Sequence, residues 1–217
     1  MLQDTLSRNK TLRYIVVIVY PNHVPRLWNE TIAAHRNDVR EAILETTWRL
    51  VEEQGLLSIT MSGVAEETGI GRATLYKYFP NVESILLAHH QRHVEQHLAH
   101  LEELGKQPGE PVDKLVAVLT EYSLISFYRG RHASPDLAAL LHRGDQADGA
   151  EQTVRGLLRD LIMNARRAGA IRNDTSPDEL AAYCQHALGA AADAPSEAAA
   201  RRLAAVTISG LQTPATS

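Results

Sequence analysis

The sequence predicts an all-α protein, with a small N-terminal helical domain and a larger helical domain after it. Three observations favour this fold class. From residue 34 onward apolar residues recur at helical spacing, no later segment alternates apolar and polar residues as a β-strand does, and glycine, proline and capping residues separate the helical segments. We therefore expect an N-terminal extension at residues 1–33, a three-helix domain at residues 34–81, and a second helical domain at residues 82–217.

Composition restricts how this protein can contact nucleic acid. The chain has 217 residues, of which 44% are hydrophobic, and this is enough for a packed core. Its formal net charge is −4, so no overall positive field attracts it to nucleic acid, and any DNA-binding surface has to be local. Cys184 is the only cysteine, which excludes an internal disulfide and fits a reducing compartment.

The N-terminal extension differs from the rest of the chain. Its apolar run Tyr14–Tyr20 is far shorter than the roughly 20 residues that a membrane-spanning helix needs. Residues 21–25 (PNHVP) follow the run, in place of the small-residue cleavage site of a signal peptide. We therefore expect no membrane association and a cytoplasmic location. Two interpretations stay open for the extension: a flexible arm or misplaced start site, or an ordered arm that contacts a partner subunit or DNA.

Local signals place the helices along the chain. Thr60 and Asn81 can cap the helices that follow them, and Gly55 and Gly69 can end the helices before them. The segment Gly105–Pro111 (GKQPGEP) is the clearest linker-like break. The expected helices lie at residues 36–54, 61–68, 72–79, 82–104, 112–129, 135–142, 148–168, 177–191 and 196–210.

The short helix at residues 72–79 has the features of the second helix of a helix-turn-helix. It follows another short helix after a tight turn that contains glycine. No acidic residue lies between Gly69 and Val82, so this segment is locally positive although the whole chain is not. The apolar residues that can form the small core of the unit are Val64, Ala65, Ile70, Leu75 and Phe79.

Side chains on this helix suit the major groove of DNA, where such helices set their N-terminal residues against base edges. Arg72 can bond guanine with two hydrogen bonds, and Thr74 can meet a base edge or a thymine methyl. Tyr76, Lys77 and Tyr78 suit phosphate contacts. The alternative is a tight helical corner in which both tyrosines pack as core. The predicted DNA-binding residues are Thr60, Arg72, Ala73, Thr74, Tyr76, Lys77 and Tyr78.

Two segments resemble a known family. Residues 40–86 (REAILETTWRLVEEQGLLSITMSGVAEETGIGRATLYKYFPNVESIL) are similar to the DNA-binding domain of the TetR-type bacterial transcriptional regulators. Residues 165–183 (ARRAGAIRNDTSPDELAAY) resemble the entry to the penultimate helix of that family. The framework positions that match the family are Thr60, Val64, Ala65, Gly69, Thr74, Leu75, Tyr76, Phe79, Glu83 and Leu86.

The resemblance implies a function. It implies that residues 34–81 are a helix-turn-helix DNA-binding domain and residues 82–217 a helical domain for ligand binding and dimerisation. The protein would be a homodimer on a palindromic operator of double-stranded DNA, and a repressor that a small-molecule effector releases. No cofactor and no enzymatic activity are expected. Cys184, the obvious nucleophile, has no partner that the sequence can place near it, and Gly-x-Ser-x-Gly and phosphate-loop motifs are absent.

Three departures from the family pattern concern DNA affinity. Gly71 stands where the family usually has a serine or threonine cap, and it is a weaker cap. Val82 stands where the family usually has a phosphate-binding lysine, so backbone amides have to serve there. The extension at residues 1–33 has no counterpart in the short tail that the family commonly shows.

Polar residues on apolar helix faces are candidates for the effector site. Tyr122 and Ser126 are the polar members of one stripe of the 112–129 helix, and His90 and His97 lie along the edge of the apolar stripe of the 82–104 helix. An apolar cavity with a few convergent polar groups is the usual form of a ligand site. The alternative is that these are ordinary core residues with satisfied hydrogen bonds.

The 82–104 helix also carries a histidine cluster: His89, His90, His93, His97 and His100. Pairs four residues apart can share a divalent metal, so a metal-responsive regulator is the alternative function. No cysteine or HExxH motif accompanies the cluster, and a closed site would need a third or fourth ligand from elsewhere. We therefore predict a polar flank rich in histidine and assign no metal site.

The last two helices are rich in small residues, which permit close helix packing. The family resemblance implies that these helices form a four-helix dimer interface. The alternative is a monomer surface of helix-favouring alanines. The residues of this pattern are Ala181, Ala182, Ala187, Gly189–Ala192 and Ala198–Ala200, with bulk from Tyr183, Leu188, Leu203, Val206 and Ile208.

Overall fold

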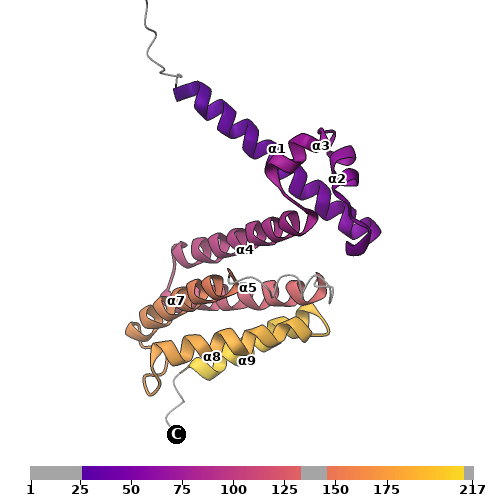
Figure 1. Ribbon diagram of the computed structural model, residues 1–217. Coiled ribbons are helices and arrows are strands. Elements are labelled where there is room, and N and C mark those ends of the chain that lie inside the picture. The colour runs from indigo at the N-terminus through magenta and orange to yellow at the C-terminus, as the bar shows by residue number, and fades with distance from the viewer. Residues whose placement is uncertain (1–25, 133–145, 213–217) are drawn as a thin grey trace, which may run out of the picture. The chain divides into compact units, whose positions relative to one another are not determined.

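Helices and short turns make up the described part of the chain. The computed structural model describes residues 26–132 and 146–212 (Figure 1). Within these ranges there is no regular strand, only an isolated antiparallel bridge between Ile171 and Gln212, so the all-α prediction is confirmed. The helix expected at residues 135–142 and the first part of the expected extension, residues 1–25, lie outside the described residues. The chain divides into two compact units, Met1–Val39 and Arg40–Ser217.

Helix α1 (Arg26–Gln54) begins earlier than expected. We expected a start at residue 36 after an extension without helical periodicity, and this boundary is wrong because residues 26–33 are helical. The physical reason is the absence of any glycine or proline between Arg26 and Gln54, whereas Pro25 precedes the helix. Gly55 follows with a φ of 80°, a conformation that favours glycine, and ends the helix as predicted.

The helix-turn-helix follows from local capping. Thr60 caps α2 (Met61–Thr68) by accepting a hydrogen bond from the Gly63 amide at 3.1 Å. Gly69 ends α2 in the left-handed conformation, with a φ of 70°. Helix α3 (Arg72–Tyr78) begins after Gly71, which gives no side-chain cap, and it ends one residue earlier than expected, at Tyr78.

The remaining helices pack around α5. Asn81 and Ser84 form a capping box at the start of α4, as the sequence predicted for Asn81. Helix α5 packs against α4, α7, α8 and α9, and so lies at the centre of this part of the fold (Figure 1). Apart from the early start of α1, each expected helix that falls on described residues is confirmed, with ends shifted by a few residues. The bounds are α4 Val82–Lys106, α5 Pro111–His132, α7 Gln146–Arg167, α8 Pro177–Gly189 and α9 Glu197–Leu211, with short 3₁₀ turns at Leu56–Ser58 and Ala190–Asp193.

Two core regions stabilise this arrangement. The larger one joins α4, α5, α7, α8 and α9 through aliphatic side chains such as Leu119, Leu158 and Leu188, each 0% exposed. The smaller one lies where α5 meets the 3₁₀ turn Ala190–Asp193. There Gly130 is required for close approach, because a Cβ atom on it would lie 2.2 Å from the Ala192 carbonyl oxygen. In the described ranges, no helix is both long and apolar enough to cross a membrane.

Candidate DNA-binding surface and effector site

Helix α3 presents most of the predicted DNA-binding residues to solvent. Its one buried residue, Leu75, is 0% exposed and anchors the helix with Phe79, Val64 and Ala65, so this predicted core is confirmed, while Ile70 is half-buried. The helix is too short to be stable alone, and this anchor therefore fixes it. The exposed residues are Arg72, Ala73, Thr74, Tyr76 and Lys77.

The two tyrosines of α3 differ in their surroundings. Tyr76 is 49% exposed, so it does not pack as core, which was the alternative for this residue. Tyr78 is half-buried, although we expected it to point outward. Thr60 lies exposed at the start of α2, where its hydroxyl serves as the cap.

The charge around α3 is locally positive, as predicted. The acidic residues that flank α3 in sequence are Glu66 and Glu67 at the end of α2 and Glu83 in the first turn of α4. Arg49 of α1 neutralises Glu67 through an ion pair of 2.8 Å. Lys77 stands in the last turn of α3, and Arg72 begins it. This end of the unit therefore offers the cations Arg72 and Lys77 to a polyanion.

The predicted effector residues of α5 are buried in the described structure. Tyr122 is 9% and Ser126 1% exposed, and they lie one helical turn apart. Burial raises the pKa of Tyr122, and Gln185 of α8 hydrogen-bonds its hydroxyl. The Ser126 Oγ atom has no hydrogen-bond partner among the described residues. A buried hydroxyl without a partner is uncommon and suits a site that a ligand completes.

The sequence did not single out one polar residue beside Tyr122, Gln185. Gln185 is 6% exposed and accepts a hydrogen bond of 3.1 Å from Arg155 Nε of α7. Its amide nitrogen donates to the Glu151 carbonyl oxygen at 3.1 Å. A glutamine inside the apolar stripe of Ala181, Cys184 and Leu188 was the signal that could have identified it.

Four of the five histidines of α4 form two pairs. His90 and His97 share an electrostatic neighbour, Arg129 of α5, which also acts on Tyr122. Burial lowers the pKa of both histidines, and Arg129 lowers it further. His90 is half-buried, whereas His97 is mostly exposed. His90, His97 and Tyr122 therefore lie near Arg129, where α4 faces α5, and His97 lies at the solvent-exposed edge of this region.

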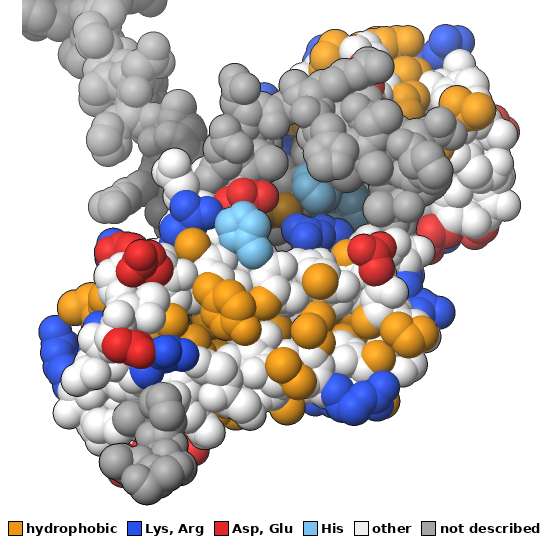
Figure 2. Space-filling view, turned by 90° about the horizontal axis from the view of Figure 1, so that it is seen from below, with side chains coloured by type: hydrophobic (Ala, Val, Ile, Leu, Met, Phe, Trp, Pro, Cys, Tyr) orange, Lys and Arg blue, Asp and Glu red, His pale blue; other side chains and the backbone are white. Residues whose placement is uncertain are grey.

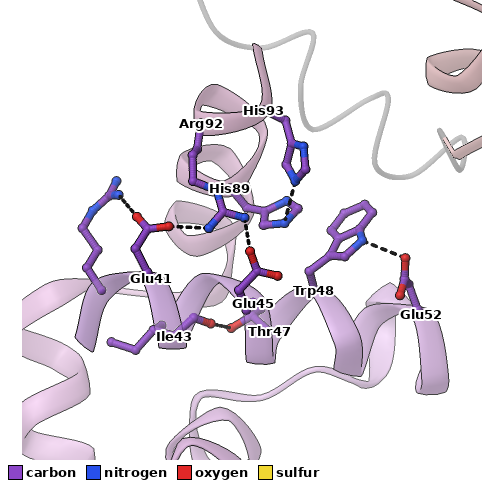
Figure 3. A network of polar contacts seen from close by, with 10 residues as sticks. Glu41, Ile43, Glu45, Thr47, Trp48, Glu52, His89, Arg92 and His93 are labelled. Carbon is purple, nitrogen blue, oxygen red and sulfur yellow. Dashed lines mark hydrogen bonds and ion pairs between the residues drawn. The ribbon is translucent and has the colours of Figure 1, made fainter. Parts of the chain in front are cut away.

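The second pair, His89 and His93, faces the C-terminal half of α1 (Figure 3). The His89 ring is 4% exposed and stacks on the Trp48 indole, with centroids 4.6 Å apart and planes within 10°. Its Nε2 atom lies 3.2 Å from that of His93. Burial, and next the charge on His93, lower the pKa of His89 to about 4.

Arg92 joins the same two helices. Its guanidinium donates to the Glu41 carboxylate and, at 2.5 Å, to Glu45 of α1 (Figure 3). The Arg92 side chain is only 14% exposed, so solvent screens these ion pairs less than it screens exposed ones. Helix α4 is therefore held to α1 by a ring stack and by two ion pairs.

Neither a metal cluster nor the surface pocket coincides with the predicted effector residues among the described residues. Among the described residues, no group of three or more His, Cys, Asp or Glu side chains is placed to hold a metal ion. A surface pocket of about 310 Å³ lies between α4, α5 and α7, where it is lined by Gly105, Pro111, Lys114, Leu161 and Asn164. This pocket contains none of the predicted effector residues.

The fold and the α3 surface define a class, the helix-turn-helix transcriptional regulators. Residues 43–89 match the family described as bacterial regulatory proteins, tetR family. Residues 114–213 match the family described as transcriptional regulator SbtR-like, C-terminal domain. The two matches together cover more than half of the chain. The protein belongs to the TetR family of DNA-binding transcriptional regulators, as its sequence motifs indicated.

Relatives of known name agree with this assignment. The HTH-type transcriptional regulator BetI of Brucella canis is 26% identical over 175 residues, covering 74% of this chain and 85% of BetI. The regulator EthR of Mycobacterium tuberculosis is 39% identical over 74 residues, which are 34% of each chain.

Solved structures share the fold. A TetR/AcrR-family regulator from Thermobifida fusca superimposes with a TM-score of 0.64 at 17% identity, covering 81% of this chain and 100% of that one. The regulator FadR of Bacillus subtilis, solved with stearoyl-CoA, gives a TM-score of 0.56 at 17% identity, covering 79% and 99%. At such identities the likeness concerns the fold alone.

Proposed function

We propose that the protein is a repressor that binds a palindromic operator through α3 and leaves it when a small-molecule effector binds. The observation that carries the DNA-binding part is the exposed, locally positive surface of α3, with Arg72 and Thr74 at the N-terminal end that enters the major groove. Thr60, Ala73, Tyr76, Lys77 and Tyr78 complete the proposed contact surface. Residues 34–81 would form the DNA-binding domain.

The proposed effector site lies between α4, α5 and α8. Its support is the set of buried polar groups where α5 meets α8: Tyr122, Gln185, and Ser126, whose hydroxyl has no partner among the described residues. His90 and His97 border this region. Structural neighbours support a small organic effector, since FadR was solved with stearoyl-CoA and SmeT with triclosan.

The proposed homodimer forms through α8 and α9. Tyr183 of α8 is 47% and Val206 of α9 65% exposed, so both helices present a large apolar side chain that a second subunit can cover. Figure 2 shows hydrophobic side chains exposed between charged ones on the side of the molecule where α8 and α9 lie. Three of the ten small residues noted in the sequence serve a different purpose, because Ala181, Ala191 and Ala200 pack inside the chain.

Coupling between effector and operator would pass through α4. An effector shifts the protein toward a DNA-incompetent state only if it binds that state more tightly than the competent one. Helix α4 contacts α5 at the proposed effector site and α1 through Arg92 and the stacked His89. It is therefore the element whose position both sites can change.

The alternative, a metal as the effector, has weaker support. His90 and His97 lie toward α5, and among the described histidines only His89 and His93 have ring nitrogens close together. No third ligating side chain joins them among the residues that the structure describes. We therefore retain an organic effector as the proposed signal.

DNA binding at two salt concentrations tests the proposal. The purified protein is titrated with DNA from upstream of its own gene and with a scrambled duplex of equal length. Arg72→Ala should reduce the preference for the specific duplex by about tenfold or more, because a bidentate contact to guanine is lost. Lys77→Ala should weaken binding to both duplexes alike and reduce the salt slope by about one.

A matched control variant distinguishes the loss of a local DNA contact from a change in the net charge of the protein. Lys106→Ala removes the same charge at the far end of α4 and should change neither affinity nor salt slope. Salt-independent binding, or an Arg72→Ala protein that discriminates as well as the wild type, would refute the α3 assignment. Equal losses in Lys77→Ala and Lys106→Ala would show that only net charge matters.

A further inference from the structure

His89 and His93 stand one turn apart on α4, and the structure turns their rings toward each other. Their Nε2 atoms are 3.2 Å apart, and the ring centroids are 4.5 Å apart (Figure 3). The next histidine along the helix, His97, does not join them as closely, because its ring centroid is 6.3 Å from that of His93. The pair is therefore distinct within the histidine cluster.

The separation of the two nitrogens fits a shared metal ion. Zinc-to-histidine bonds are about 2.0–2.1 Å long. For an ion bonded to both Nε2 atoms, the N–metal–N angle would therefore be about 100°. This angle lies between that of tetrahedral and that of square coordination. Two histidines at i and i+4 on one helix face are a known way for a protein to hold such an ion.

The pair is also held in place by its neighbours. Stacking on Trp48 fixes the plane of His89, and Arg92 ties the same turn of α4 to Glu41 and Glu45. A chelate that is already oriented loses little side-chain entropy when the ion binds. His93 is half-buried, which leaves a path for the ion from solvent.

We propose that His89 and His93 chelate one divalent transition-metal ion through their Nε2 atoms. Cu²⁺ should bind most tightly, then Ni²⁺ and Zn²⁺, because imidazole suits these ions and affinity peaks at copper. Water fills the remaining positions, since no third His, Cys, Asp or Glu ligand is available in the described structure. The neutral ring that donates between the two Nε2 atoms moves its proton to Nδ1, so both lone pairs meet the ion without net proton release.

This site is separate from the proposed effector site. His90 and His97 lie toward Arg129 and Tyr122 of α5, whereas the chelating pair faces Trp48 of α1. Ion binding can thus be tested without DNA and without knowledge of the effector.

Quenching of Trp48 fluorescence by Cu²⁺ tests the site directly. The chain has two tryptophans, so Trp28→Phe leaves Trp48 as the single emitter, stacked on one of the ligands. In this background Cu²⁺ should quench the emission saturably at one ion per chain, and Mg²⁺ should not. His93→Ala should weaken Cu²⁺ binding about tenfold or more, because half of the chelate is lost.

His93 is the better position for the decisive variant, because it is less buried than His89 and its loss leaves the Trp48 stack intact. The matched control is His97→Ala, which should leave the quenching curve unchanged. Absence of saturable quenching, or equal quenching in His93→Ala and its parent, would overturn the proposal. Loss of quenching in His97→Ala would overturn it too, and would move the chelate to His93 and His97.

Discussion

The indole of Trp48 and the imidazole of His89 lie face to face, with centroids 4.6 Å apart and planes within 10° of parallel. One ring belongs to α1 and the other to α4, so this stack joins the helix that precedes the helix-turn-helix to the helix that follows it. The indole nitrogen donates to Glu52 at 2.8 Å, one turn farther along α1. Both rings are thus fixed, one by a hydrogen bond and the other by burial.

Replacement of His89 should show how much of this joint depends on ring stacking. His89→Ala should lower the free energy of unfolding by about 1–3 kcal/mol, because a buried aromatic contact is lost. His89→Phe should lower it less, because a ring still covers Trp48. Urea denaturation followed by circular dichroism measures both. Equal losses in the two variants would show that the stack itself contributes little.

The ion pair between Arg92 and Glu45 should couple more strongly than an exposed pair within α1. A double-mutant cycle with Arg92→Gln and Glu45→Gln should give a coupling free energy of about 1 kcal/mol, because the Arg92 guanidinium is mostly shielded from solvent. The matched cycle uses Arg49 and Glu53, which are both about half exposed and four residues apart on α1. We expect about 0.3–0.5 kcal/mol there. A smaller coupling for Arg92 than for Arg49 would contradict a structural role for the α1–α4 bridge.

Features set by neighbouring residues could be predicted from the sequence. Thr60, Gly69 and Asn81 were identified as helix boundaries, and each acts within a few residues of itself. The start of α1 was predicted wrongly, since the pattern of apolar residues before residue 36 is irregular while no helix breaker is present. At that position the absence of glycine and proline predicted the start of α1 better than the apolar periodicity did.

Features set by distant residues could not be predicted. Helical periodicity placed His90 and His97 at the edge of the apolar stripe of α4, but it did not show that His89 and His93 turn toward α1 and toward each other. This orientation depends on which helix packs on each side of α4. That the Ser126 hydroxyl has no partner among the described residues likewise depends on residues distant in sequence. For the DNA-binding surface local information was sufficient to place the helix, because α3 and its caps are contiguous.

Gly130 should tolerate no side chain. In Gly130→Ala the new Cβ atom would lie 2.2 Å from the Ala192 carbonyl oxygen, so α5 and the 3₁₀ turn at residues 190–193 would have to separate. We expect a loss of about 2 kcal/mol or more in the free energy of unfolding, as for other overpacked sites. Thermal denaturation measures it.

Gly156 provides the matched control for that substitution. It also lies within a helix, α7, but a Cβ atom there would meet nothing within 4 Å. Gly156→Ala should therefore raise stability by about 0.5–1 kcal/mol through helix propensity. If both variants shift the melting temperature in the same direction, the close contact at Gly130 does not control stability.

Cys184 should be inert in the folded protein. Its side chain is 0% exposed, and burial raises the pKa of the thiol to about 12, so almost none is thiolate at pH 8. A chromogenic disulfide reagent at pH 8 should not react with the native protein on the timescale of minutes, and should label one thiol per chain in urea. Rapid labelling of the native protein would contradict the burial of this residue.

The same pKa shift predicts how stability depends on pH. In the unfolded chain the thiol loses its proton near pH 9, whereas in the fold it keeps the proton up to about pH 12. Above pH 9 the folded state therefore binds more protons than the unfolded state, and the stability associated with this group falls as pH rises. Other groups titrate in this range as well, so the comparison is with Cys184→Ala. The free energy of unfolding of the wild type should fall more steeply between pH 9 and pH 10.5 than that of the variant, and parallel curves would contradict the raised pKa.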